Sequence, residues 1–407
     1  MTIAPARVAT SPRVVVAGLL CLDIIPSIRA GGPASTAPPA PGELEVIGPA
    51  ALALGGCVGN TGVALHRLGL QTTLVARIAD DPFGRILGRL VRAAVPGGRA
   101  RLIRTPGGAT SYSVIDSRPE VDRAIRHFPG VNDRFVADDV PSEVLGRASL
   151  LHVGYPPLMA DLVADDGREL ARLMAAAHRH GAITSLDMAS AESGPGAGVA
   201  DRRSRWQALL RRVLPDVDVF LPSLDEAAHL LDRAVRRDGG GAPAMEDLAG
   251  LAGELLELGA GIAGLKLGGH GLYVRSAPTA RIAAVPGGLA AAWVDRELHS
   301  TVFESHVVGT TGAGDATIAG FLFGLVNGMS PEATMTAACA VGGASTEAAD
   351  GTTGIPDWRT IERRIAGGWR RREDPPGAGW RPAGDPGLWL GPLDRAGHDD
   401  PAGSPRR

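Results

Sequence analysis

Residues 309–325 read GTTGAGDATIAGFLFGL and carry the strongest structural signal in this chain. A run of small residues is followed at once by apolar residues at helical spacing: Ile318, Phe321, Leu322 and Leu325. This spacing predicts a buried helix that begins directly after a glycine-rich turn. Because the first amide groups of a helix have no acceptor within it, the turn offers N–H groups and a favourable helix dipole to an anion.

Asp315 lies in the first turn of the predicted helix, beside that anion site. A carboxylate here can take a proton from a hydroxyl that attacks a phosphoryl group, while the adjacent amides neutralise charge on the transferring oxygens. The alternative interpretation is an ordinary acidic residue after a glycine-rich helix start. The string GAGD alone does not decide between the two, because short glycine motifs often mislead.

The longer string resembles the C-terminal signature of the ribokinase-like carbohydrate kinases, the PfkB family, which is usually written DTTGAGDAF followed by AG. The resemblance implies that Asp315 is the catalytic base. The implied anion hole consists of three residues: Gly312, Ala313 and Gly314. Two residues of the preceding turn are implied to bind the nucleotide: Thr310 and Thr311. Gly309 stands where the family usually has Asp, a departure that concerns local ion or water coordination and not the base.

Residues 55–85, GGCVGNTGVALHRLGLQTTLVARIADDPFGR, contain a second signal. A glycine pair leads into a predicted helix that ends at Gly69, and a strand follows. Glycines let a ligand approach the backbone, and Asn60 can donate and accept towards hydroxyls, although an Asn near a helix start can also be a cap. The string resembles the family's N-terminal signature, which implies sugar-contacting roles for Gly55, Gly56 and Asn60.

Two further residues are candidates for substrate binding. Asp23 follows the first predicted strand, and a carboxylate at the carboxyl end of a strand in an α/β sheet lies where ligands bind; a surface turn is the alternative. In the family an Asp at this place holds two sugar hydroxyls. Residues 123–132, RAIRHFPGVN, resemble the family's lid segment, which implies that Arg123 contacts the substrate.

The nucleotide and metal residues are implied by two shorter resemblances. Residues 222–228, PSLDEAA, resemble a family element in which the residue at Glu226 organises Mg²⁺ and its waters, with Ser223 in place of the usual Asn. Residues 266–271, KLGGHG, resemble the strand and turn that lie against ATP; alone, they would equally suit a hairpin turn. The implied nucleotide-binding residues are Ser223, Lys266, Gly268 and Gly269.

Short apolar runs alternate with amphipathic stretches along the chain, which predicts a mostly parallel sheet covered by helices. The expected strands are 13–17, 72–77, 150–153, 183–187, 217–221, 264–267 and 271–275. The expected helices are 60–68, 160–180, 224–232 and 245–258. With the resemblance, we expect a ribokinase-like α/β fold: a central, mostly parallel sheet flanked by helices on both faces, with a small β lid.

The expected domain organisation has one globular body. The segments are a disordered leader over residues 1–12, the kinase domain over 13–366 with a lid from about 24–54 and 108–130, and a disordered tail over 367–407. The tail is dense in Pro, Gly and charge and shows no periodicity, although its Trp residues leave a docking role open.

The bulk composition excludes several functions. The chain has 407 residues, 44% hydrophobic and 21% charged, with a net charge of -3, which is ordinary for a globular enzyme. Only 4% are aromatic and no basic stripe appears, which argues against nucleic-acid binding. No apolar stretch reaches the roughly 18 to 20 residues of a membrane span. The 3 cysteines are isolated, as in a reducing compartment. We therefore expect a cytoplasmic protein without a membrane partner.

Together these signals predict an ATP- and Mg²⁺-dependent kinase that phosphorylates a hydroxymethyl group of a sugar or sugar-like small molecule. A nucleoside kinase of the same fold and a non-catalytic sugar or nucleotide sensor are the alternatives. A dinucleotide-dependent oxidoreductase is set aside, because the first strand leads into GLLCLD and not into GxGxxG. The sequence leaves open a monovalent-cation requirement, which is common in the family, and assembly as a homodimer.

Overall fold

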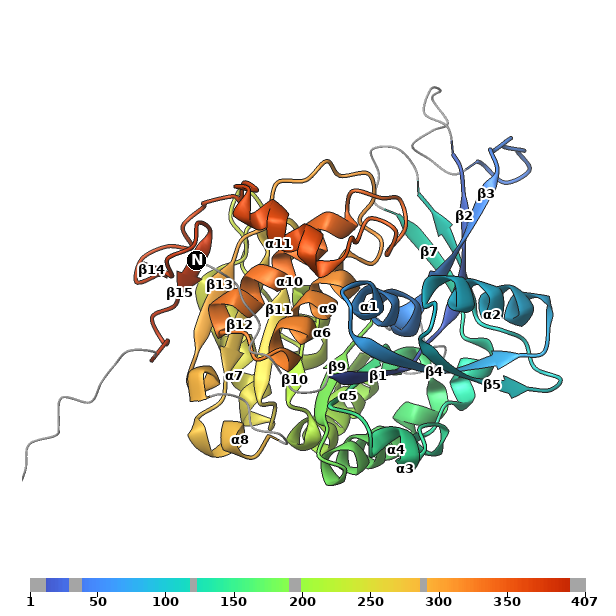
Figure 1. Cartoon of the computed structure of the whole chain (residues 1–407), viewed down its shortest axis with the longest axis horizontal. Helices are drawn as coiled ribbons and strands as arrows, with labels where there is room; N and C mark the ends of the chain where they lie inside the picture. Colours follow the sequence, from blue (N-terminus) through green and yellow to red (C-terminus); the bar gives the residue numbers. More distant parts are fainter. Residues whose placement is uncertain (1–11, 29–38, 118–122, 190–198, 286–290, 396–407) are drawn as a thin grey trace, which may run out of the picture.

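The computed structural model describes residues 12–28, 39–117, 123–189, 199–285 and 291–395, which contain two sheets (Figure 1). The larger sheet has 11 strands in the order β14-β15-β13-β12-β11-β10-β9-β8-β1-β4-β5. Its strands are β1 (Arg13–Gly18), β4 (Gln71–Ala79), β5 (Arg99–Thr105), β8 (Leu150–Gly154), β9 (Ile183–Asp187), β10 (Val219–Phe220), β11 (Ile262–Lys266), β12 (Leu272–Ser276), β13 (Glu297–Ser300), β14 (Arg381–Pro382) and β15 (Leu388–Leu390).

The strands from β5 to β11 pair in parallel and form the central part of this sheet. Strand β1 lies between β4 and β8, with Val16 opposite Leu74 on one side and His152 on the other. The strand is an almost continuous run of Val and Ala because helices cover both of its faces. Strands β12, β13, β15 and β14 extend the sheet in antiparallel pairing. The central parallel sheet predicted from the sequence is confirmed.

Helices cover both faces of the large sheet, and each face has its own apolar core. One core receives side chains from α1 (Gly56–Arg67), α2 (Pro82–Ala94), α8 (Thr279–Ala283), α9 (Ala313–Val326), α10 (Pro331–Ser345) and α11 (Trp358–Ala366). The other receives them from α3 (Ser142–Leu145), α4 (Ala160–Arg179), α5 (Val199–Val213), α6 (Leu224–Leu231) and α7 (Met245–Glu257).

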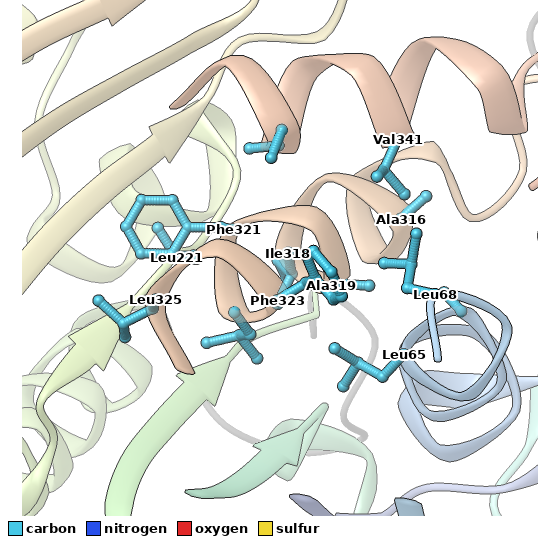
Figure 2. Packing of buried hydrophobic residues seen from close by; sticks show 14 of the residues in the cluster. Leu65, Leu68, Leu221, Ala316, Ile318, Ala319, Phe321, Phe323, Leu325 and Val341 are labelled. Atoms are coloured by element: carbon cyan, nitrogen blue, oxygen red, sulfur yellow. The ribbon is translucent and has the colours of Figure 1, made fainter. Parts of the chain in front are cut away.

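Helix α9 is largely buried, and Figure 2 shows its apolar side chains packed beside those of α1 and α10. Leu65 of α1 and Val341 of α10 both belong to this core. A Cβ at Gly320 would lie 2.6 Å from the carbonyl oxygen of Ala337, so only glycine lets the backbones of α9 and α10 come this close. Packing on all sides fixes the position of the α9 N-terminus, where the GAGD string lies.

The smaller sheet has 4 strands in the order β3-β2-β6-β7. They are β3 (Ala50–Gly55), β2 (Cys21–Pro26), β6 (Tyr112–Asp116) and β7 (Ala124–Phe128). Strand β2 follows β1 almost directly, and β3 leads directly into α1, so this sheet continues the chain beyond the carboxyl end of β1 (Figure 1). It occupies the region in which the sequence predicts a lid.

Most predicted elements occur close to their expected positions, and three differ. Helix α1 begins at Gly56, before the expected start at residue 60, because the glycine pair itself opens the helix. Strand β10 has only 2 residues of the expected run over 217–221. Helix α4 is interrupted by non-helical backbone from Ala164 to Gly167, which the apolar spacing does not reveal.

The sequence predicts a disordered tail over residues 367–407, and this prediction is wrong for residues 367–395. Strand β15 pairs with β13, and its Leu388 is 1% exposed. The buried guanidinium of Arg371 lies 4.7 Å from the ring centroid of Phe303. A few apolar and aromatic anchors are therefore enough to hold a segment whose Pro- and Gly-rich composition carries no periodic pattern.

Parts of three predicted segments lie outside the described residues. They are residues 1–11 of the leader, residues 29–38 and 118–122 of the lid, and residues 396–407 of the tail. Within the described ranges, no helix has the length and apolar character needed to cross a bilayer.

Candidate active site

The N-terminus of α9 places the GAGD string in a sharply defined turn. Gly312 is the N-cap residue, with φ +72°, and a Cβ on it would lie 2.6 Å from the Cα of Gly351. Glycine is needed here because both the backbone conformation and the close approach exclude a side chain. The Ala313 amide donates to the Thr310 carbonyl at 3.2 Å, which closes the turn. The predicted anion hole therefore relies on the remaining first-turn amides, including that of Gly314.

Asp315 lies in the first turn of α9, is 2% exposed, and accepts hydrogen bonds at both carboxylate oxygens. Its Oδ2 accepts from Asn60 Nδ2 at 3.0 Å and from the Tyr155 hydroxyl at 2.6 Å. Its Oδ1 accepts from the Thr61 hydroxyl at 3.0 Å. Three donors from two separate parts of the chain fix the orientation of this carboxylate, which suits a base that must face an incoming hydroxyl.

A buried ion pair lies beside the same turn. The Lys266 ammonium is 2.7 Å from Asp187 Oδ1 and would be 3.7 Å from a Cβ built on Gly314. Burial opposes the charged form of Lys266, but the carboxylates of Asp187, Glu226 and Asp315 outweigh it and raise its pKa above the usual value. The structure thus adds a fixed positive charge to the predicted anion site.

Asp23 lies on β2, 6% exposed, with its carboxylate packed against Gly55. A Cβ on Gly55 would lie 2.2 Å from Asp23 Oδ1, so any larger residue at Gly55 would displace this carboxylate. Burial, together with the negative charge of Asp315, raises the pKa of Asp23 to about 6, although hydrogen bonds from Cys21 and Ser113 oppose the shift. The predicted sugar residue and the predicted base are therefore neighbours.

Asn60 and Gly56, both predicted to contact the sugar, have different local surroundings. Asn60 Nδ2 is occupied by Asp315, while its Oδ1 is buried and has no hydrogen-bond partner within the described residues. Such an acceptor is suited to an incoming hydroxyl. Gly56 has φ +76°, and its Cβ would lie 2.5 Å from the carbonyl oxygen of Leu19, so it serves the tight start of α1.

Arg123 connects the small sheet to the turn before α9. Its Nη1 donates to the Thr310 hydroxyl at 2.8 Å. The structure therefore brings together one residue predicted to bind substrate and one predicted to bind the nucleotide. Thr311, the next residue of the turn, is partly exposed directly before Gly312.

The predicted nucleotide turn after β11 is open. Gly268, with φ +57°, and Gly269 have no atom within 4 Å of the Cβ that would be added to them. Gly271 is different, because its Cβ would lie 1.9 Å from the Ser300 carbonyl oxygen, so it fixes the turn against β13. The turn therefore has room for a ligand over its first two glycines.

Ser223 and Glu226 form a capping box at the start of α6. The Ser223 hydroxyl accepts from the Glu226 amide at 3.2 Å, and Glu226 Oε2 accepts from the Ser223 amide at 2.7 Å. Both residues thus have a local structural role that the resemblance did not indicate. Ser223 also forms a parallel bridge with Lys266, so the capping box adjoins the ion pair.

The described residues do not include a group of three or more His, Cys, Asp or Glu side chains arranged to hold a metal. Mg²⁺ in phosphoryl-transfer enzymes needs only one or two carboxylates in addition to the phosphates. Asp187 Oδ2 is buried and has no hydrogen-bond partner in the described parts of the chain. Asp187 and Glu226 therefore provide the carboxylates that such a Mg²⁺ site requires.

Gly309, where the family usually has Asp, lies between two backbone carbonyls. A Cβ here would be 2.9 Å and 3.0 Å from the carbonyl oxygens of Ala348 and Ala349. A side chain would therefore require the backbone around these two residues to shift. The local structure explains why the residue is glycine in this chain.

Sequence reasoning missed two residues that contact Asp315, namely Thr61 and Tyr155. Thr61 directly follows the predicted Asn60 and lies on the same helix. Tyr155 is the first residue after β8, at the carboxyl end of a parallel strand, which is the usual position of ligand-binding residues in such sheets. This position after a buried strand is the sequence signal that could have identified Tyr155 as a site residue.

Comparisons with known proteins give the family. A model of the pfkB family carbohydrate kinases matches residues 37–358. An uncharacterised sugar kinase of Archaeoglobus fulgidus is 25% identical over 266 residues, which are 65% of this chain and 87% of the relative.

Solved structures agree with the fold. The structure of Arabidopsis thaliana ribokinase with ribose and ATP has a TM-score of 0.65 at 18% identity and covers 87% of this chain and 98% of its own. Adenosine kinase from Sinorhizobium meliloti has a TM-score of 0.64 at 21% identity, with coverage of 88% and 99%. The sheet, the enclosed α9 and the extent of the family match lead to one conclusion: the chain belongs to the pfkB family of carbohydrate kinases, phosphotransferases whose acceptor is an alcohol group.

Proposed function

We propose that the protein transfers the γ-phosphoryl group of ATP to a hydroxymethyl group of a sugar or sugar-like small molecule, with Asp315 as the general base. The observation that carries this proposal is the buried Asp315 carboxylate, held by three hydrogen bonds in the first turn of α9. The neighbouring Lys266 ammonium supplies positive charge on the same side of the turn.

In the proposed reaction, Asp315 takes the proton of the acceptor hydroxyl while that oxygen forms its bond to the γ-phosphorus and the bond to the β,γ-bridging oxygen breaks. Lys266 and the first-turn amides of α9 stabilise the negative charge on the transferring oxygens. Asp23 and Asn60 Oδ1 orient the sugar through its hydroxyls. Mg²⁺, when bound near Asp187 and Glu226, supplies charge neutralisation at the phosphates.

A nucleoside acceptor is the second candidate, because a nucleoside also carries a hydroxymethyl group on its sugar. Tyr112 of β6 lies 5.5 Å, between ring centroids, from both Phe83 and Phe128. In the pairing of β6 with β2, Tyr112 lies opposite Leu22 and Ser113 lies opposite Asp23, so these rings are on the other face of the small sheet from Asp23 and give the sugar site no surface on which a base could stack. The likeness to an adenosine kinase is compatible with this alternative.

The test measures ATP consumption with a panel of sugars, nucleosides and sugar phosphates. We expect turnover with at least one unphosphorylated sugar, and a decrease of about 10² to 10⁴ in kcat for Asp315→Asn with little change in KM. A matched control is Asp80→Asn, because the side chain of Asp80 is 66% exposed. Preference for a nucleoside would support the second candidate, whereas ATP binding without turnover on any acceptor, or full activity of Asp315→Asn, would contradict the proposal.

A further inference from the structure

Tyr155 has an unusual backbone conformation directly after β8, with φ 64° and ψ 40°. In the described parts of the chain, the other non-glycine residues with positive φ are aspartates: Asp165, Asp166, Asp232 and Asp295. Aspartate tolerates this left-handed region because its short side chain can bond locally, an option that an aromatic residue lacks. Other contacts must therefore hold Tyr155 in place.

Tyr155 donates two hydrogen bonds, and both lead to the candidate active site. Its hydroxyl donates to Asp315 Oδ2 at 2.6 Å, and its amide donates to the Asp187 carbonyl at 3.3 Å. Asp187 is the last residue of β9 and also forms the ion pair with Lys266. Pro156 disfavours the right-handed helical region for the residue before it. The unusual backbone thus directs the phenol at the base.

The hydrogen bonds at Asp315 leave little room on the carboxylate. A carboxylate has about four acceptor positions. Asn60 and Tyr155 occupy both positions of Oδ2, and Thr61 occupies one of Oδ1. Asn60 and Thr61 belong to α1 whereas Tyr155 follows β8, so two separate elements fix the rotation of the carboxylate. The acceptor position that these three hydrogen bonds leave open is on Oδ1.

We propose that Tyr155 is a positioning residue for the base: its hydrogen bond to Oδ2 fixes the Asp315 carboxylate and favours its ionised form, so that Oδ1 receives the proton of the acceptor alcohol. The inference rests on the proposed function of Asp315 and extends it to a residue for which the resemblance implied no role.

Tyr155 keeps its proton over the working pH range. Burial raises the pKa of its phenol well above the usual value, and the carboxylates of Asp315 and Asp187 raise it further. The other ionisable groups that interact electrostatically with Asp315 come from β2, α1, β9 and β11: Asp23, Cys57, Asp187 and Lys266. Replacement of Tyr155 by Phe leaves all of these groups present, so a changed pH profile reports the lost hydrogen bond.

The test compares the pH dependence of kcat in wild type and Tyr155→Phe between about pH 5 and pH 9, with ATP and the best acceptor from the panel. Loss of a donor to the carboxylate moves the acid limb of kcat to higher pH. At the plateau, kcat falls about tenfold with KM within about twofold, because the base is no longer held in one orientation. Thr61→Val, which removes the donor to Oδ1, shifts the acid limb in the same direction.

Tyr273→Phe is the matched control. The buried Tyr273 hydroxyl donates to Glu297 Oε1 at 2.5 Å, a bond of the same kind between β12 and β13. This variant keeps the wild-type profile.

An acid limb that stays at its wild-type position in Tyr155→Phe, or faster turnover by this variant, would overturn the inference. If Asp315→Asn is inactive at the same time, the proposed function still stands. Full activity of Asp315→Asn would instead contradict the proposed function, and therefore also the inference about Tyr155.

Discussion

The ionisable residues of the candidate site are buried close together, and each changes the charge state of the others. Asp23 and Lys266 both respond to the charge of Asp315, although they lie on β2 and β11. Burial destabilises a charged side chain that has no oppositely charged or hydrogen-bonding partner. Clusters of buried ionisable residues are therefore typical of sites that bind ligands or perform chemistry. The site therefore places one buried ammonium group, that of Lys266, among several carboxylates.

We expect Asp23 to make substrate binding depend on pH. Its pKa is raised to about 6, mainly by burial, so its carboxylate takes up a proton as the pH falls through that value. A neutral carboxyl accepts fewer hydrogen bonds from sugar hydroxyls, and we therefore expect KM for the sugar to rise as the pH falls below about 6. Steady-state kinetics at a series of pH values measures this.

The matched variant for this prediction is Asp23→Asn, which cannot ionise. We expect a higher KM than wild type at pH 8 and no further rise as the pH is lowered. If KM in the wild type is flat through this range while kcat changes, the pH dependence belongs to Asp315 and not to Asp23.

Among the elements, the segment after α11 differs most from its sequence-based prediction. Residues 388–390 add a strand to the sheet, and the nearby Asp394 carboxylate is 2.8 Å from the Arg296 guanidinium, with both side chains buried. A buried charge pair and a buried strand are not compatible with a solvated tail. This segment is part of the structural core of the enzyme.

Leu388→Ala tests the role of this segment in stability. Leu388 is 1% exposed, so we expect the free energy of unfolding to fall by about 2 to 4 kcal/mol, as for other buried Leu residues cut back to Ala. Urea unfolding measures the change. Leu393→Ala is the control from the same segment, because Leu393 is 49% exposed and its loss should cost less than about 0.5 kcal/mol. Equal effects of the two variants would mean that β15 does not pack as described.

For the whole molecule, the contact between Arg123 and Thr310 links the small sheet to the proposed phosphate site. We expect Arg123→Gln to weaken closure of the small sheet, which lowers kcat/KM about tenfold and raises the fraction of ATP that is hydrolysed without sugar phosphorylation. Parallel assays of ADP and sugar phosphate measure that fraction. Arg126→Gln, at an exposed position of β7, should leave both quantities unchanged. The same ratio of ADP to sugar phosphate in both variants would contradict this role.

Much of this molecule could be predicted from local sequence patterns. The parallel strands around β1 and the helix after Gly312 follow from apolar periodicity and glycine placement. What could not be predicted depends on contacts between distant residues. Tyr155 and Asp315 are 160 residues apart, and no local pattern around either one indicates the other. The order of residues 367–395 likewise depends on the edge of β13, which those residues do not encode.

The pairing of β15 with β13 has a consequence for biosynthesis. A ribosome makes β13 well before residues 388–390, so the backbone N–H and C=O groups along one side of β13 have no strand to pair with during that interval. Exposed strand edges are places where chains associate wrongly. The nascent enzyme is therefore exposed to wrong association at this edge until β15 has been made, an interval that begins before Asp315 is synthesised and continues after it.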